Sequence, residues 1–114
     1  MRVATWNVNS VKAHIEVVTR WLGEAKPDVV CLQEIKCEEQ NFPAAVFEEL
    51  HYSAAVFGQK TYNGVAILSK FPLENIVRGL PGDAPDDQSR YLHATVLDGS
   101  RSATLASTNL PNAT

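Results

Sequence analysis

The chain has 114 residues, of which 45% are apolar and 20% are charged, and its formal net charge is −3. These values describe one ordinary globular domain that can bury a hydrophobic core without disulfides or a structural metal. No stretch approaches the roughly eighteen apolar residues of a membrane span, which excludes a membrane protein. Residues 1–12 lack the apolar segment of a secretory signal, so we do not expect routine secretion. The two cysteines, Cys31 and Cys37, form no metal or CxxC motif, so we expect a reducing, cytoplasmic environment.

The first third of the chain predicts a strand, a helix and a second strand. Residues 3–8 alternate in polarity as a strand does, and Ser10 can cap a helix whose apolar residues recur at helical spacing over residues 11–25, until Pro27 ends it. Residues 28–34 form a short apolar run with polar ends, which is typical of a strand covered on both faces. A helix that crosses between two strands joins them in parallel, so their carboxyl ends should share one edge of the sheet.

That shared edge should carry Asn7 and Asn9 from the first strand, and Glu34 and Lys36 from the second. Mg²⁺ sites in proteins use one or two carboxylates together with waters and substrate phosphates, so Glu34 could supply the carboxylate and an asparagine could hold its neighbours. Lys36 could face the same phosphate. Spacing alone favours the simpler interpretation, in which these side chains merely end two strands in solvent.

The remaining sequence predicts one short helix and then strands only. Residues 43–50 form the helix, with Pro43 in its first turn, and the loop over residues 79–87 is the only long acidic one. Turn residues separate the candidate strands, which cover residues 52–57, 64–69, 74–78, 91–97 and 101–107. We therefore expect an α/β fold with a mixed sheet of six or seven strands and helices on one face.

Four sequence blocks stand out along the chain. They are Ala-Thr-Trp-Asn-Val-Asn at 4–9, Asp-Val-Val-Cys-Leu-Gln-Glu at 28–34 followed by Lys36, Gly-Gln-Lys-Thr-Tyr-Asn-Gly-Val-Ala-Ile-Leu-Ser at 58–69, and Arg-Gly-Leu-Pro-Gly-Asp at 78–83. In this order and spacing they resemble the amino-terminal half of the exonuclease III family of bacterial abasic-site endonucleases, within the endonuclease/exonuclease/phosphatase superfamily. The resemblance runs over residues 1–97.

The resemblance implies a Mg²⁺-dependent phosphodiesterase, with Mn²⁺ as an alternative ion, that cuts double-stranded DNA at abasic sites and trims blocked 3′ ends in base excision repair. By motif, Glu34 matches a metal-ligand glutamate, Asn7 an asparagine that supports the metal and catalytic groups, and Asn9 a residue near the metal. Lys36 matches a basic residue beside the site. The matches to DNA-contacting residues are Lys12, Tyr62, Asn63 and Arg90.

The residues alone explain Tyr62 equally well as an aromatic packed on its own turn, and Lys12 as a solvated helix cation. The family's second half supplies a further aspartate, an Asp-x-Asn segment and a closing Ser-Asp-His, and this sequence contains none of them. Asn109 and Ala113 also depart from a Tyr and a Gly of the family pattern.

We therefore expect residues 1–114 to be a partial domain: half of a two-sheet α/β sandwich, inactive alone, with its general base outside the chain. The face of the sheet opposite the helices should be left as an exposed apolar surface. Two alternatives remain: a superfamily phosphatase that acts on a small phosphoester, and a non-catalytic binding module with the same half-fold.

Overall fold

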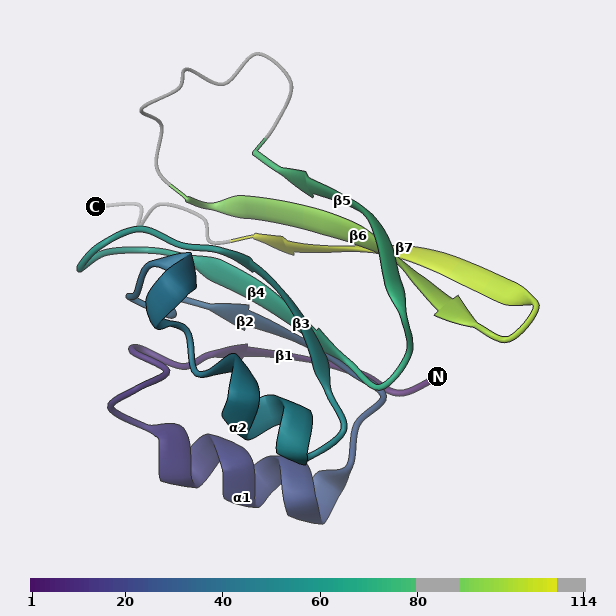
Figure 1. Cartoon of the computed structure of the whole chain (residues 1–114), viewed down its shortest axis with the longest axis horizontal. Helices are drawn as coiled ribbons and strands as arrows, with labels where there is room; N and C mark the ends of the chain where they lie inside the picture. The colour runs from purple at the N-terminus through teal and green to yellow at the C-terminus, as the bar shows by residue number, and fades with distance from the viewer. Residues whose placement is uncertain (80–88, 109–114) are drawn as a thin grey trace.

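The computed structural model describes residues 1–79 and 89–108 and shows two stacked sheets with helices on one side (Figure 1). In chain order the elements are β1 (Val3–Asn7), α1 (Ile15–Ala25), β2 (Val29–Gln33), the 3₁₀ helix η1 (Glu39–Asn41), α2 (Ala44–Glu49), β3 (Ser53–Phe57), β4 (Val65–Ser69), β5 (Leu73–Arg78), β6 (Tyr91–Asp98) and β7 (Arg101–Thr108). Within the described residues, none of the helices is long and apolar enough to cross a membrane. Apart from Gly79, the predicted acidic loop lies outside the described residues.

The predicted strand, helix and strand at the start of the chain are confirmed. β1 and β2 pair in parallel, and β2 pairs antiparallel with β4, which pairs antiparallel with β3. The predicted start of the first helix is wrong, because α1 begins at Ile15. The Val11 amide donates instead to the Ile35 carbonyl, 3.1 Å away, and this bond draws the chain toward the end of β2. Ser10 caps a turn, with its Oγ accepting from the Ala13 amide at 3.2 Å.

The mixed α/β architecture is as predicted, but the strands of the described residues divide between two sheets instead of forming one. The first sheet has the order β1-β2-β4-β3 and the second the order β5-β6-β7. The burial patterns give the reason. β4 is buried along its whole length and must be covered on both faces, whereas β6 buries every second residue and presents a single apolar face. β6 and its neighbours can therefore serve as the outer layer.

α1 and α2 cover one face of the first sheet (Figure 1). Val18 and Leu22 of α1 and Phe47 of α2 are buried there against the β2 residues Val30 and Leu32. The rings of Trp6 and Trp21 meet edge to face at the border of this core, with centroids 5.3 Å apart. The apolar stripes predicted for both helices therefore form the first core.

The second sheet covers the opposite face of the first, so the expectation that this face is left exposed is wrong. Leu92, Ala94 and Val96 of β6 are buried against a cluster on the first sheet that comprises Val29, Cys31, Ala55, Val65 and Ile67. The strands needed to cover the face lie within the chain itself. Burial raises the pKa of the Cys31 thiol to about 11, as expected for an unreactive thiol in an apolar layer.

Candidate functional site

Three loops meet at the end of the first sheet where β1 and β2 both finish. The Ser10 amide donates to the Glu34 carbonyl at 2.8 Å, which joins the loop after β1 to the loop after β2. The Ile35 amide donates to the Gly64 carbonyl at 3.1 Å, and the Lys36 amide to the Asn63 carbonyl at 2.9 Å. These bonds tie the loop before β4 to the same place. We call the surface formed by residues 7–10, 34–36 and 63–64 the rim.

The centre of the rim is a contact between Asn7 and Glu34. The Asn7 side-chain amide donates a hydrogen bond to the Glu34 carboxylate, and the Asn7 Oδ1 accepts one from the Asn9 backbone amide at 3.2 Å. Asn7 is exposed and Glu34 is half-buried. The Glu34 backbone is left-handed, with φ of 53°, because the chain turns sharply at the end of β2. This turn and the Asn7 bond together fix the direction of the carboxylate.

A second pair lies beside the first. The Lys36 Nζ donates to the Asn9 Oδ1 at 2.6 Å, and both residues have left-handed backbones, with φ of 55° and 46°. The asparagine therefore holds an ammonium group at the rim, on the same loops that carry Glu34. The structure thus brings together Asn7, Asn9, Glu34 and Lys36, as expected from the parallel pairing of β1 and β2.

The predicted DNA-contacting residues Tyr62, Asn63 and Arg90 lie in the rim, or next along the chain to a residue of the rim or to one bonded to it. Asn63 belongs to it through its carbonyl, whereas Tyr62, at 67% exposure, projects from the preceding turn. Arg90 follows Ser89, whose carbonyl accepts from the Gly64 amide at 2.9 Å, so the start of β6 also reaches this end of the sandwich.

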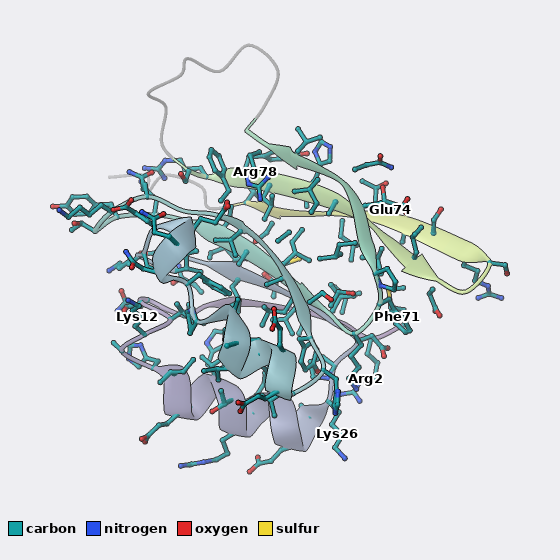
Figure 2. All side chains as sticks on the ribbon, in the orientation of Figure 1. Arg2, Lys12, Lys26, Phe71, Glu74 and Arg78 are labelled. Atoms are coloured by element: carbon teal, nitrogen blue, oxygen red, sulfur yellow. The ribbon has the colours of Figure 1, made fainter. Side chains whose placement is uncertain are left out.

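Lys12 is an exposed residue of the turn between β1 and α1. Its charge acts on the Cys37 thiol, whose pKa is raised by burial and lowered to a lesser extent by the Lys12 ammonium. Figure 2 shows Lys12 at one end of the molecule, and Arg2 and Lys26 at the other. The predicted cation therefore lies at the end that carries the rim.

A polar connection that the sequence does not predict lies beneath the rim. The Gln33 Nε2 donates to Thr5 Oγ1 at 3.0 Å and to Ser107 Oγ at 3.2 Å, and Ser107 Oγ donates to the Leu32 carbonyl at 2.9 Å. Ser107 is 1% exposed. Gln33 could have been noticed as an amide that ends an apolar strand, but no local signal marks a serine 74 residues away. This connection locks the last residues of β2 to the second sheet.

The donor chemistry of the rim fits part of a Mg²⁺ site. A glutamate carboxylate and amide oxygens are ligands of the type that Mg²⁺ accepts, and such sites take their remaining ligands from water and substrate phosphate. Among the described residues, no three His, Cys, Asp or Glu side chains cluster closely enough to enclose a metal ion. These residues therefore fit an open site with one protein carboxylate and no closed cage.

The chain matches known proteins along most of its length. It is 36% identical over 94 residues to exodeoxyribonuclease III of Haemophilus influenzae, a match that covers 82% of this chain and 35% of that enzyme. The solved structure of NExo, a 3′ phosphatase from Neisseria bound to a product DNA hairpin, superposes with a TM-score of 0.81 at 41% identity, over 84% of this chain and 37% of that one. The structure of an AP endonuclease from Archaeoglobus fulgidus superposes with a TM-score of 0.79 at 40% sequence identity, over the same shares of the two chains.

This chain therefore spans little more than a third of the length of these relatives. The profile of the endonuclease/exonuclease/phosphatase family matches residues 4–108, which include every residue of the rim and all of both sheets except Val3. The chain belongs to the endonuclease/exonuclease/phosphatase family.

Proposed function

We propose that the chain is a partial domain, residues 1–114, that supplies the amino-terminal part of a Mg²⁺-dependent DNA phosphodiesterase of base excision repair. The activity is cleavage at abasic sites and trimming of blocked 3′ ends. The observation that carries this proposal is the contact between Asn7 and Glu34 at the rim. Relatives that contain the same fold include an exodeoxyribonuclease, a DNA 3′ phosphatase and an AP endonuclease.

Each rim residue has a role that its contacts support. Glu34 is the metal ligand, Asn7 orients its carboxylate, and Asn9 lies beside both and holds Lys36. When bound, Mg²⁺ supplies Lewis-acid polarisation of the scissile phosphate. The Lys36 ammonium adds a positive charge next to the same phosphate, where it offsets negative charge in the transition state. Mn²⁺ offers similar chemistry and is the alternative ion.

The DNA-binding residues lie around that centre. Lys12 and Arg90 provide cations for the phosphate backbone, which dominates the affinity of proteins for DNA. The exposed ring of Tyr62 and the neighbouring Asn63 project toward a duplex distorted at an abasic site. The partner is therefore double-stranded DNA with abasic or 3′-blocked sites, and the free cysteines Cys31 and Cys37 suit a cytoplasmic location.

Turnover needs groups beyond those of the rim. Among the described residues the rim contains one carboxylate, Glu34, and no histidine or second acid that could activate a water molecule. We therefore propose that the 114-residue chain is inactive or nearly so alone, and that the general base comes from the further length that its relatives possess.

The test joins residues 1–108 to the carboxy-terminal remainder of the Haemophilus influenzae exodeoxyribonuclease III. This chimera should cleave an abasic duplex in a Mg²⁺-dependent manner, and Glu34→Gln should reduce the rate by orders of magnitude while the circular dichroism spectrum stays the same. Glu24→Gln, which changes an exposed carboxylate on α1, is the matched control. An unchanged rate for Glu34→Gln at limiting Mg²⁺ would reject the ligand role.

Two further substrates separate the alternatives. A duplex with a 3′-phosphate tests the trimming activity, and an inositol phosphate tests a phosphatase that acts on small phosphoesters. Preference for the inositol phosphate would replace the DNA proposal. No turnover of any substrate by a folded chimera would favour the binding module.

A further inference from the structure

The turn that carries Tyr62 is held at its base from both sheets. It covers residues 58–64, between β3 and β4. On the side of the first sheet, the Asn63 carbonyl accepts from the loop after β2 at 2.9 Å. On the side of the second sheet, the Gly64 amide donates to the Ser89 carbonyl, also at 2.9 Å. The ring of Tyr62, at 67% exposure, therefore projects from a turn whose base is fixed.

A side chain of the same turn makes a second bond to Ser89. The Gln59 Oε1 accepts from the Ser89 amide at 2.6 Å. Gln59 and Gly64 lie near the two ends of the turn, and together they engage both the N–H and the C=O of one residue, as a neighbouring strand does. Ser89 is 4% exposed, so its amide has little access to water. Loss of the Gln59 acceptor would therefore leave a buried donor unsatisfied or force the segment to move.

The same bond fixes the chain that leads to Arg90. Ser89 precedes this residue, and Tyr91, which follows it, is the first residue of β6 and pairs with Thr108 of β7. The backbone is thus bonded on both sides of Arg90. The point from which its guanidinium extends is set by Gln59 on one side and by β6 on the other.

The backbone at Gln59 is itself held by the residue before it. A Cβ added at Gly58 would collide with the Cys37 carbonyl oxygen, so the start of the turn packs directly on the loop after β2. Gln59 is half-buried next to this contact. Its bond to Ser89 therefore connects two fixed segments, one on the first sheet and one on the second.

We propose that Gln59 is a positioning residue that determines how strongly the nuclease proposed above prefers an abasic duplex to an intact one. It holds the Tyr62 turn and the Arg90 segment in one arrangement, so that the ring and the cation meet the DNA together. The inference rests on the proposed function, and it assigns a residue that acts through its neighbours and does not touch the DNA.

Preference and overall affinity depend on different features of this arrangement. A cation near the phosphate backbone attracts every duplex alike, and this attraction tolerates small movements because it falls slowly with distance. A ring that presses against a distorted base stack makes short-range contacts, which weaken sharply when the ring moves by about 1 Å. Release of the Gln59 bond should therefore reduce the preference for the abasic duplex and leave the affinity for an intact duplex nearly unchanged.

The first test removes or keeps the acceptor oxygen in the chimera described above. Dissociation constants are measured by fluorescence anisotropy in EDTA, for an intact duplex and for one with a tetrahydrofuran abasic site. Gln59→Met removes the amide oxygen at nearly constant side-chain length, and it should lower the preference by about three- to tenfold, the value of one hydrogen bond. Gln59→Glu keeps an acceptor oxygen, so it should weaken both complexes through its charge and retain their ratio. Gln40→Met is the matched control, because Gln40 is exposed and its amide bonds only to the nearby Glu38 among the contacts of its side chain; it should change neither constant.

The second test needs no DNA and uses the 114-residue chain itself. Amide hydrogen exchange, followed by NMR, should be slow at Ser89 and Gly64 in the native chain, because each amide is bonded in this connection. Both amides should exchange faster in Gln59→Met, and Gln59→Glu should restore the slow exchange. The amide of Ile67, in the middle of β4, should not change in either variant and reports that the sheet is intact.

The outcomes separate this inference from the function on which it rests. Equal binding of the two duplexes by the unaltered chimera would overturn the proposed DNA function and this inference with it. An unchanged preference in Gln59→Met would overturn the inference alone, and so would unchanged exchange at Ser89. Equal losses of preference in Gln59→Met and Gln59→Glu would also overturn it, since the acceptor oxygen would then not be the group that matters.

Discussion

Gly64 connects the rim to β4, and replacing it with alanine tests whether close packing or backbone strain holds this connection. Gly64 has a φ of 91°, and a Cβ added there would lie 2.6 Å from the Ile35 Cγ1. A left-handed conformation costs a residue with a Cβ about 1–2 kcal/mol, and overpacking a buried side chain costs about 1–3 kcal/mol. Gly64→Ala should therefore destabilise the chain by about 2–5 kcal/mol.

Gly99 provides the matched control. It also has a positive φ, 62°, but a Cβ there would meet no atom within 4 Å. Gly99→Ala should therefore lose only the conformational part, about 1–2 kcal/mol. Urea unfolding gives both values, with all variants at one protein concentration because association would add to the apparent stability. Equal losses at the two positions would refute the contact with Ile35 as the source of the difference.

Three other measurements address the core, the pH response and DNA binding. Ser107→Ala should cost about 1–3 kcal/mol of unfolding free energy because it leaves buried polar partners unsatisfied, whereas Ser102→Ala on the exposed part of β7 should change it by less than about 0.5 kcal/mol. The pKa of Cys31 is raised from 9.0 to about 11, so the thiol loses its proton at lower pH in the unfolded chain than in the folded one. The free energy of unfolding should therefore fall between pH 9 and 11, by up to about 1.4 kcal/mol per pH unit. Urea unfolding at a series of pH values should show a smaller fall for Cys31→Ala. In the chimera, Lys12→Ala should lower the salt slope of DNA binding by about one, whereas Lys26→Ala at the opposite end should not change it.

The rim could be predicted from the sequence because it depends on one strong topological rule. Helical spacing over residues 11–25, between two strand patterns, requires parallel strands whose carboxyl ends coincide. The contact between Asn7 and Glu34 follows from that rule, since each residue stands at or just after the end of its strand. Their chemical roles depend on partners outside the described residues and remain predictions.

The division into two sheets could not be predicted in this way. Alternating polarity shows that β6 has one apolar face, but it does not show which layer that face contacts. The hydrogen bond between Gln33 and Ser107 could not be predicted for the same reason, because it forms only when the second sheet packs on the first. Contacts between residues so far apart along the chain leave no periodic signal in either segment.

The structure also explains why the rim should keep its shape when its chemistry is changed. Asn9, Glu34, Lys36 and Asn63 all have left-handed backbones, a conformation that costs energy and persists only where surrounding contacts enforce it. Here the enforcing contacts are backbone hydrogen bonds between the three loops, and none of them uses the Glu34 carboxylate. Glu34→Gln therefore removes a charge from a surface that the backbone has already fixed, so a loss of activity in that variant would report on metal chemistry and not on unfolding.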